Sequence, residues 1–447
     1  MKSYPGLIKT LILIVLSLVL NAGSSGVCRA EVLSLDECLN LALKNNPDVH
    51  MAAQNVKKSE SNLRYSYGSL LPNLSTSFSK GHVYYGPSSV QFDSQGRPVQ
   101  NTGFDYNNYG FRINSDMVIF DGMGNFSRIA SARHNRNSAL EQFKYNNDMI
   151  AASVIRAYYN LVRNKMLLTV QEESIEQARQ NLERSEALLE VGAATRADVL
   201  KARVRHSNTR LTMISTRNRS ELAREDLIAL LNTRSNGVVD VDTDLKIDFR
   251  DFDQDAEIGF ALENRPDLKS LKYNMKAASS GITSARSSWF PVIGASFGYT
   301  WNDREMADNL NFFKEEYAWS LTGYISLNIF DRFQTSTNLA NAKADYRIAE
   351  YNLEKSELDA VREIKGLMFG MREARERIAV ATETVEQAME DLRLAEERYR
   401  VGAGTMLETI DAQVALTQAK ADVIQAKCDY LVADADIARA TGRMSNN

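Results

Sequence analysis

The sequence contains one long segment twice. Four short motifs of the first half return in the same order in the second half. In order, they are Asn46-Pro47-Asp48 and Arg265-Pro266-Asp267, Leu71-Pro72 and Phe290-Pro291, Phe120-Asp121-Gly122 and Phe330-Asp331-Arg332, and Val191-Gly192-Ala193-Ala194-Thr195 and Val401-Gly402-Ala403-Gly404-Thr405. The first two recur 219 positions later (47 to 266, 72 to 291) and the last two 210 positions later (121 to 331, 191 to 401). The chain is therefore expected to fold as one large supersecondary unit copied once, with its length change between the second and third motifs.

Residues 1–30 have the pattern of a secretory signal peptide. Lys2 and Lys9 precede an apolar run over 11–20, and Cys28-Arg29-Ala30 forms a small-residue cleavage site. The mature chain is then expected to begin at Glu31. Lipidation of Cys28 is the alternative, which the preceding Val27 disfavours. Both interpretations predict export.

The mature chain is acidic. Without Lys2, Lys9 and Arg29, 50 basic residues face 57 acidic ones, a net charge of −7. This charge argues against nucleic acid as a partner. No apolar run of about 18 residues follows the signal, so any membrane span must be a β-strand. Cys38 and Cys428 are expected to be two buried hydrophobic residues rather than a disulfide.

Two long stretches without proline have the periodicity of coiled-coil helices. Large apolar residues recur every seven positions, and in the second copy they alternate with alanines at every interleaved position except Leu367. The large residues are Ile364, Met371, Ile378, Val385, Leu392 and Tyr399, and their first-copy equivalents are Val154, Leu161, Leu168, Ile175, Leu182 and Leu189. The pattern predicts helices over about 123–190 and 333–400, each roughly 100 Å long, with a return helix packed against each.

The Val-Gly-Ala-x-Thr motifs are predicted to be the turns between these helices. Glycine can adopt the left-handed conformation that ends a helix, and threonine can cap the next one. Helical tips are therefore expected at about 190–198 and 400–408. Asp121 and Asp331 are expected to be the N-caps of the long helices.

Between the second and third motifs the hydrophobic period changes to two, which predicts strands. The segments are about 73–82 and 109–120 in the first copy, and about 292–301 and 317–329 in the second. Each strand has one apolar and one polar face and the length of a tilted membrane strand. A soluble sandwich would also alternate, but aromatic residues at both ends of the hairpins favour contact with lipid.

The resulting organisation is a first repeat over 31–232, an acidic linker over 233–257 and a second repeat over 258–447. Within the linker, Asp240-x-Asp242-x-Asp244 resembles the start of a calcium-binding EF-hand loop. Leu245 occupies the position that requires glycine, and Asp251 replaces the closing glutamate. We therefore expect a solvated linker rather than a calcium site.

The expected fold class is an α+β membrane protein with four membrane strands and long coiled-coil helices per chain. Four strands cannot close a barrel, and an open sheet edge is costly in hydrocarbon. The chain must therefore form oligomers. The polar inner face favours three or more copies, because eight strands leave an interior filled with side chains.

The order of the doubled motifs resembles that of the outer membrane efflux proteins, the TolC-like exit ducts of tripartite export systems. The resemblance covers residues 33–443. It implies a homotrimer in the cell outer membrane, with a twelve-stranded β-barrel continuous with an α-helical barrel in the periplasm. It also implies an exit duct for efflux or type I secretion, supplied by an inner-membrane transporter through a periplasmic adaptor protein and gated at the helix tips.

The same resemblance implies roles for residues at the tips. Those of the adaptor-docking tips are Val191, Gly192, Ala193, Thr195, Val401, Gly402, Ala403 and Thr405. Asp198 and Tyr399 match a hydrogen-bonded latch pair, although packing in the helical seam also explains Tyr399. Glu408 and Asp411 match an acidic ring at the constriction, although acids in a first helical turn also complement the helix dipole. Gly404 stands where the family has the arginine of a salt-bridged latch.

No pattern typical of an enzyme is present. The four histidines, His50, His82, His134 and His206, are scattered, and the sequence has no H-E-x-x-H, no G-x-S-x-G and no cysteine–histidine metal spacing. We therefore predict no catalytic residue, no cofactor and no metal site. A periplasmic coiled-coil scaffold would explain the heptads but not the hairpins with their aromatic ends.

Overall fold

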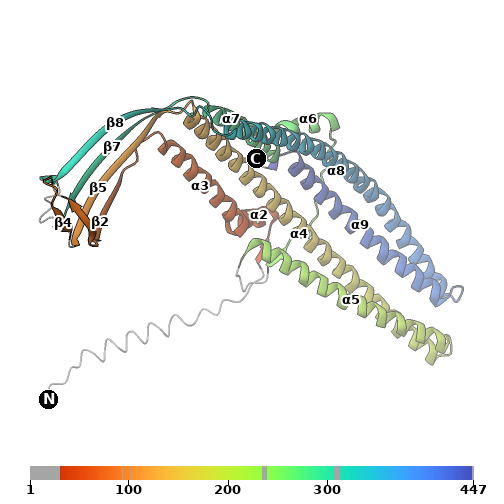
Figure 1. Cartoon of the computed structure of the whole chain (residues 1–447). Coiled ribbons are helices and arrows are strands. Elements are labelled where there is room, and N and C mark those ends of the chain that lie inside the picture. The colour runs from red at the N-terminus through yellow and green to blue at the C-terminus, as the bar shows by residue number, and fades with distance from the viewer. Residues whose placement is uncertain (1–30, 93, 102, 234–238, 307–312, 445–447) are drawn as a thin grey trace, which may run out of the picture. The chain divides into compact units, whose positions relative to one another are not determined.

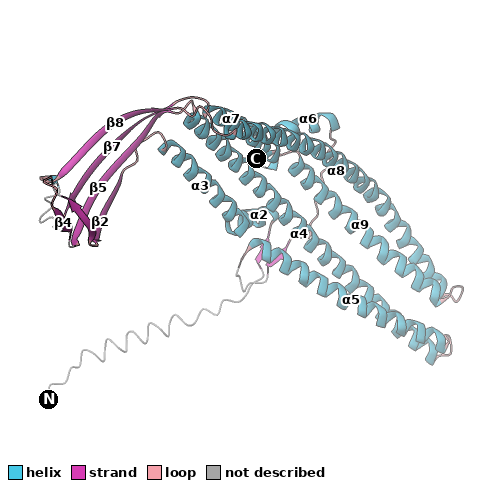
Figure 2. Cartoon of the chain, in the orientation of Figure 1, coloured by secondary structure: helices cyan, strands magenta, loops and turns pink. Residues whose placement is uncertain are grey.

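The computed structural model describes residues 31–92, 94–101, 103–233, 239–306 and 313–444. The predicted signal peptide and Cys28 lie outside these residues. Most of the described chain is helical (Figures 1 and 2). The helices are α2 (Leu35–Asn45), α3 (Pro47–Gly68), α4 (Gly124–Glu190), α5 (Arg196–Leu231), α6 (Gln254–Asn264), α7 (Pro266–Ser287), α8 (Gln334–Arg400) and α9 (Met406–Ala440).

The long helices α4 and α8 have 67 residues each. They begin and end within one residue of the predicted bounds. The seam of α8 is buried at Ile364, Met371, Ile378 and Leu392, and the intervening alanines fill the smaller gaps. None of the described helices is both long enough and apolar enough to cross a membrane.

Four strands form one antiparallel sheet in the order β2-β5-β7-β8. They are β2 (Ser75–Tyr85), β5 (Phe104–Phe120), β7 (Val292–Asp303) and β8 (Tyr317–Ser326). The central pair, β5 and β7, joins the two copies. β8 ends three residues before the predicted end at 329, because its partner β7 begins only at Val292, after Pro291. β5 begins at Phe104 rather than near 109, because β2 extends to Tyr85, which pairs with Phe104.

The register gives the sheet one apolar and one polar face. Rows across β5, β7 and β8 on one face are Phe111–Trp301–Tyr317, Ile113–Tyr299–Trp319 and Ser115–Phe297–Leu321. The alternate rows are Arg112–Thr300–Ala318, Asn114–Gly298–Ser320 and Asp116–Ser296–Thr322. Trp319 and Leu321 are 64% and 71% exposed. An apolar face exposed to this degree indicates a surface that meets a partner or lipid.

Two further strand pairs were not predicted. β3 (Ser88–Phe92) and β4 (Pro98–Asn101) form a short hairpin between β2 and β5. β1 (Glu31–Leu33) pairs in parallel with β6 (Val239–Val241).

The chain forms two compact units, and each takes segments from both copies. The sheet unit consists of Ala52–Lys144 and Pro266–Asp359, and the helix unit of Met1–Met51, Tyr145–Arg265 and Ala360–Asn447. The two compact units therefore do not coincide with the two consecutive repeats, because matching elements of the two copies pack side by side.

The described part of the predicted linker, residues 239–257, keeps most of its aspartates exposed to solvent, but it is also anchored on the helices, which was not predicted. Residues 239–253, called the strap below, pack on the helix unit: Val239 and Val241 are buried, and Ile247 and Phe252 contact a core cluster of α8 and α9. The Tyr430 hydroxyl accepts a hydrogen bond from the Arg250 backbone N–H at 3.0 Å. The packing of these apolar residues was not predicted, because aspartates separate them in the sequence. Among the described residues, no group of three potential ligands could hold a metal ion.

Cys38 and Cys428 are free and buried, as predicted. Burial raises the pKa of each thiol to about 11. Both therefore remain protonated at neutral pH and act as small hydrophobic residues.

Asp121 and Asp331 cap the long helices from further upstream than predicted. Asp121 Oδ1 accepts a hydrogen bond from Asn125 N at 3.0 Å, and Asp331 Oδ2 accepts one from Thr335 N at 2.7 Å. Each acid therefore lies three residues before the first helical residue. The chain between turns through the left-handed conformation, with φ of 66° at Gly122 and 54° at Arg332.

The first motif of each copy holds the end of that copy's last helix. Asn46 Nδ2 donates to the Leu230 carbonyl at 3.0 Å, and Arg265 Nη1 donates to the Ala440 carbonyl at 3.1 Å. Leu230 and Ala440 are equivalent positions 210 residues apart. Different side chains thus satisfy the same unpaired helix-end carbonyl.

Arg265 also belongs to a buried ionic cluster. Arg265 and Arg439, whose side chains are 7% and 9% exposed, both donate to Glu363, at 2.7 and 2.5 Å. Burial raises the pKa of Glu363, but the hydrogen bonds from the two arginines outweigh it and hold that pKa below its usual value. The cluster fixes the C-terminal ends of α6 and α9 to the middle of α8.

We predict opposite effects of alanine at two glycines of the sheet unit. A Cβ at Gly122 would lie 2.6 Å from Phe290 Cβ and 2.7 Å from the Ser287 carbonyl oxygen. Together with the positive φ, this should destabilise Gly122→Ala by about 2 kcal/mol or more. No atom lies within 4 Å of a Cβ placed on Gly281, within α7, so Gly281→Ala should stabilise by about 0.5–1 kcal/mol. Urea unfolding followed by tryptophan fluorescence measures both, and equal midpoints would contradict this account.

Replacing Glu363 by glutamine should destabilise the helix unit by about 3 kcal/mol at pH 7, because two buried arginines lose their counter-ion. Since the folded pKa of Glu363 is lowered, its contribution is complete above the usual value of 4.5 and is lost as the pH falls through the folded pKa. The stability difference between wild type and Glu363→Gln should therefore shrink below about pH 4.5. Glu357→Gln, which removes an exposed pair with Lys272, is the control and should cost about 0.5 kcal/mol or less.

Candidate functional site at the helix tips

The two tips end their rising helices in the same way. Ala193 N donates to the Leu188 carbonyl at 2.8 Å and Gly192 N to the Leu189 carbonyl at 3.0 Å. In the second tip, Ala403 N donates to the Arg398 carbonyl at 2.8 Å and Gly402 N to the Tyr399 carbonyl at 3.1 Å. Gly192 and Gly402 have φ of 78° and 77°. Each glycine therefore closes a Schellman turn, as predicted.

Threonine caps both return helices. Thr195 Oγ1 accepts from Asp198 N at 3.2 Å, and Asp198 Oδ2 in return accepts from Thr195 N at 3.1 Å. Thr405 Oγ1 likewise accepts from Glu408 N at 3.2 Å. Hydrogen bonds from the Thr195 hydroxyl and backbone lower the pKa of Asp198. The first tip is thus a reciprocal capping box whose acid is charged at neutral pH.

The second tip carries an ion pair that the sequence analysis missed. Arg398 Nη2 lies 3.6 Å from Glu408 Oε2 and donates to the Ala403 carbonyl at 3.4 Å. Arg398 replaces Leu188 of the first tip, so the charge is specific to the second copy. A Cβ at Gly404 would lie 3.0 Å from Arg398 Cβ and 3.1 Å from Tyr399 N. The glycine therefore allows a tight turn against Arg398.

The predicted gate residues are not joined within one chain. The Asp198 carboxylate is used by Thr195, and the buried hydroxyl of Tyr399 has no hydrogen-bond partner among the described residues. Glu408 is half-buried by its contacts with Thr405 and Arg398, and Asp411 is exposed. The structure thus brings Asp198 and Glu408 together with their capping threonines.

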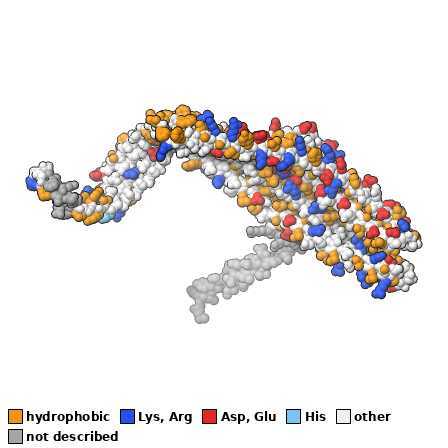
Figure 3. Space-filling view, turned by 45° about the vertical axis from the view of Figure 1, so that its right-hand side comes forward, with side chains coloured by type: hydrophobic (Ala, Val, Ile, Leu, Met, Phe, Trp, Pro, Cys, Tyr) orange, Lys and Arg blue, Asp and Glu red, His pale blue; other side chains and the backbone are white. Residues whose placement is uncertain are grey.

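The residues at the turns are open to contact. Val191 and Val401 are 77% and 72% exposed, and no atom lies within 4 Å of a Cβ placed on Gly192 or Gly402. Charges of both signs are interspersed over the helices that lead to the turns (Figure 3). Each turn therefore presents a bare backbone next to an exposed valine.

Near the tips, the two helical hairpins meet through polar contacts between α4 and α9. Gln413 Nε2 donates to Gln177 Oε1 at 2.8 Å, and Lys420 Nζ pairs with Glu173 at 2.7 Å. Gln413 is 2% exposed, whereas the pair of Lys420 with Glu173 lies at the surface. Further along α4 and α9 the interface becomes apolar, where Val170, Ile424 and Cys428 form a cluster.

A family model described as outer membrane efflux protein matches residues 38–233 and 258–443. The chain belongs to the outer membrane efflux protein family. The efflux proteins and the similar solved structures are channels of the outer membrane and not enzymes.

Similar proteins match nearly the whole chain. The probable efflux pump outer membrane protein TtgC of Pseudomonas putida is 24% identical over 420 residues, which cover 92% of this chain and 83% of TtgC. The outer membrane channel CmeC of Campylobacter jejuni has the same fold, with a TM-score of 0.78, 18% identity and coverage of 91% of this chain and 85% of CmeC. The outer membrane protein VceC of Vibrio cholerae gives a TM-score of 0.76, 18% identity and coverage of 91% and 96%. The present efflux protein therefore has the TolC-like fold.

Proposed function

We propose that this protein is the outer-membrane exit duct of a tripartite efflux or type I secretion system. The observation that supports it most is the combination, in one chain, of a sheet with one apolar face and two long helical hairpins that end in bare turns. TtgC, by its description, is the outer membrane protein of an efflux pump. Cargo would pass from an inner-membrane transporter and a periplasmic adaptor to the exterior.

The proposed assembly is a homotrimer in the outer membrane that extends into the periplasm. Within the described sheet, β2 and β8 each pair on one side only. Their free backbone groups must be satisfied when the apolar face meets lipid. Three copies, joined β8 to β2, would close a twelve-stranded barrel above a barrel of helices.

The proposed gate lies at the tips, where residues 190–198 and 400–408 of each copy would surround the entrance. Opening requires the hairpins to separate, and the polar seam between α4 and α9 can exchange its hydrogen bonds for water. Asp198 would leave Thr195 to bind the Tyr399 hydroxyl in a latched state. Glu408 and Asp411, repeated by threefold symmetry, would favour cations at the mouth.

Adaptor docking is proposed at the turns. A glycine without neighbouring atoms lets a partner helix approach the backbone closely, and Val191 or Val401 supplies an apolar contact beside it. The linear arrangement is the same in both tips, so each chain would offer two related sites.

A bulky residue in either turn should block this docking. Gly192→Trp and Gly402→Trp should each lower the yield of cross-links to the adaptor at least tenfold, because the ring occupies the space over the backbone. The measurement is cross-linking in cells, with the oligomer checked by migration before and after heating. Gly259→Trp, on α6 and equally open, is the control. Undiminished cross-linking in the two tip variants would refute docking at the turns.

The latch proposal predicts the conductance of single channels. Purified protein in planar bilayers should conduct ions, and Asp198→Asn combined with Tyr399→Phe should raise the mean conductance several-fold. Asp391→Asn, which removes an exposed acid of α8, should leave it at the wild-type value. Unchanged conductance in the double variant rejects the latch, whereas absence of any wild-type channel rejects the duct.

A further inference from the structure

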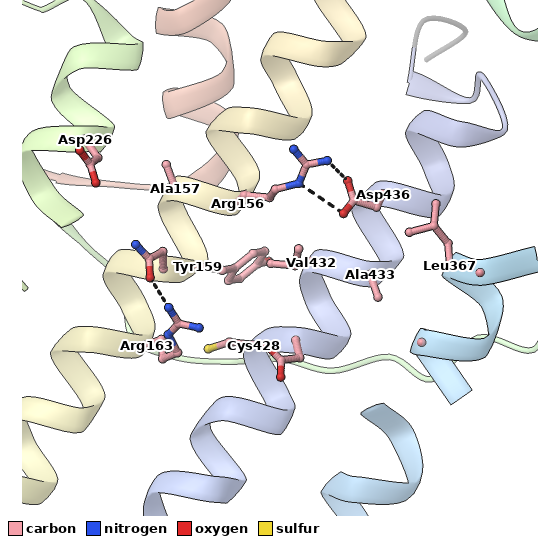
Figure 4. A pocket seen from close by; sticks show the side chains of 14 residues that line it. Arg156, Ala157, Tyr159, Arg163, Asp226, Leu367, Cys428, Val432, Ala433 and Asp436 are labelled. Atoms are coloured by element: carbon pink, nitrogen blue, oxygen red, sulfur yellow. Dashed lines mark hydrogen bonds and ion pairs between the residues drawn. The ribbon is translucent and has the colours of Figure 1, made fainter. Parts of the chain in front are cut away.

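A hollow of about 510 Å³ lies in the helix unit between α4, α8 and α9, with Asp226 of α5 at its rim. Tyr159 and Arg163 enter it from α4, and Cys428 and Val432 from α9 (Figure 4). Its volume is within the range of pockets that hold small organic molecules.

The two copies differ at the positions that form this hollow. Arg156 and Asn160 of α4 correspond, 210 residues later, to Gly366 and Gly370 of α8. All four line the hollow. No atom lies within 4 Å of a Cβ placed on either glycine. The second copy therefore lacks two polar side chains where the first has them, and their absence leaves the space open.

Most charges around the hollow are compensated within the chain. Arg156 binds Asp436 through both Nε and Nη2, at 3.3 and 2.5 Å. Asp429 accepts from Gln425 at 2.6 Å and pairs with Arg377 at 3.3 Å. The carboxylates of Asp436 and Asp429 therefore already have partners within the chain.

Arg163 is different. It donates only to neutral amide oxygens, those of Gln425 at 3.2 Å and of Asn160, and forms no ion pair within the described chain. Its side chain is half-buried at the wall of the hollow. A guanidinium in this state can bind a carboxylate or sulfonate through two parallel hydrogen bonds.

Apart from Asn160 and the exposed Asp226, the rest of the lining is apolar or aromatic. Leu367, Val432, Ala433 and the ring of Tyr159 surround the space left by the two glycines. The strap packs on α8 through Met368, and Gly366 and Gly370 are each two residues from Met368, about 200° around the helix. The hollow therefore lies on the opposite side of α8 from the strap.

We propose that this hollow binds a small amphipathic organic anion, whose carboxylate or sulfonate pairs with Arg163 and whose apolar body occupies the space over Gly366 and Gly370. A cation of the same shape would be repelled by Arg163. The proposal concerns binding to this chain and does not depend on the duct.

Calorimetric titration of purified protein in lipid nanodiscs tests this, with 2-naphthoate as the probe and 2-naphthylmethylammonium as its cationic counterpart. Wild type should bind one naphthoate per chain saturably, and the ammonium at least tenfold more weakly. Arg163→Gln removes the charge, and Gly370→Leu fills the space while raising helix propensity. Each should weaken naphthoate binding at least tenfold. Arg203→Gln, at an exposed pair with Glu186, is the control and should bind as wild type does.

Three results would overturn the site: no saturable binding to wild type, wild-type affinity in Arg163→Gln, or equal affinity for the two probes. Thermal unfolding of each variant shows that it is folded. Conductance of the same preparation separates this proposal from the duct. Protein that conducts but does not bind naphthoate refutes the site alone, and protein that binds but does not conduct refutes the duct alone.

Discussion

The four-stranded sheet imposes the strongest constraint on this protein, because its two edges carry backbone groups that the described chain does not satisfy. β2 and β8 are the edge strands, and the face between them is lined by rows such as Phe111–Trp301–Tyr317. In water, the backbone groups of the edge strands could bind solvent, but the apolar face would remain exposed. In lipid, the apolar face would be in a favourable medium, but the backbone groups of the edges would have no partner. In the proposed assembly, further copies of the same sheet would satisfy both edges while the apolar face meets lipid.

Much of this architecture could be predicted from the sequence. Heptads located α4 and α8 within one residue, and the Gly and Thr of each tip identified the Schellman turns and N-caps, because these features depend on local chemistry. The anchoring of the strap was not predicted because its aspartates dominate the composition, while a contact such as Arg250 N to Tyr430 Oη joins residues 180 positions apart. Strand pairing also determines where the strands end. β8 ends at Ser326, which pairs with Val292, the first residue of β7. The ion pair of Arg398 with Glu408 was equally hard to predict, because it requires knowing how tightly the turn at Gly404 closes.

Duplication explains both what the two halves share and where they differ. Asn46 and Arg265 perform the same task at the end of their copy's last helix, but only Arg265 also enters a buried cluster with Glu363 and Arg439. Gly366 and Gly370 open a hollow where Arg156 and Asn160 fill the equivalent positions. The second copy thus has a buried ionic cluster and an open space that the first copy lacks at the equivalent positions.

The polar seam between the hairpins has a thermodynamic consequence. Parting Gln413 from Gln177 and Lys420 from Glu173 exposes groups that water can bind, whereas parting the cluster of Val170, Ile424 and Cys428 exposes apolar surface. Separation limited to the polar contacts near the tips would therefore change the heat capacity of the protein little, since that quantity follows the apolar area exposed. An apolar interface weakens on cooling. Opening limited to the polar contacts would thus depend less on temperature than opening that also parts the apolar cluster.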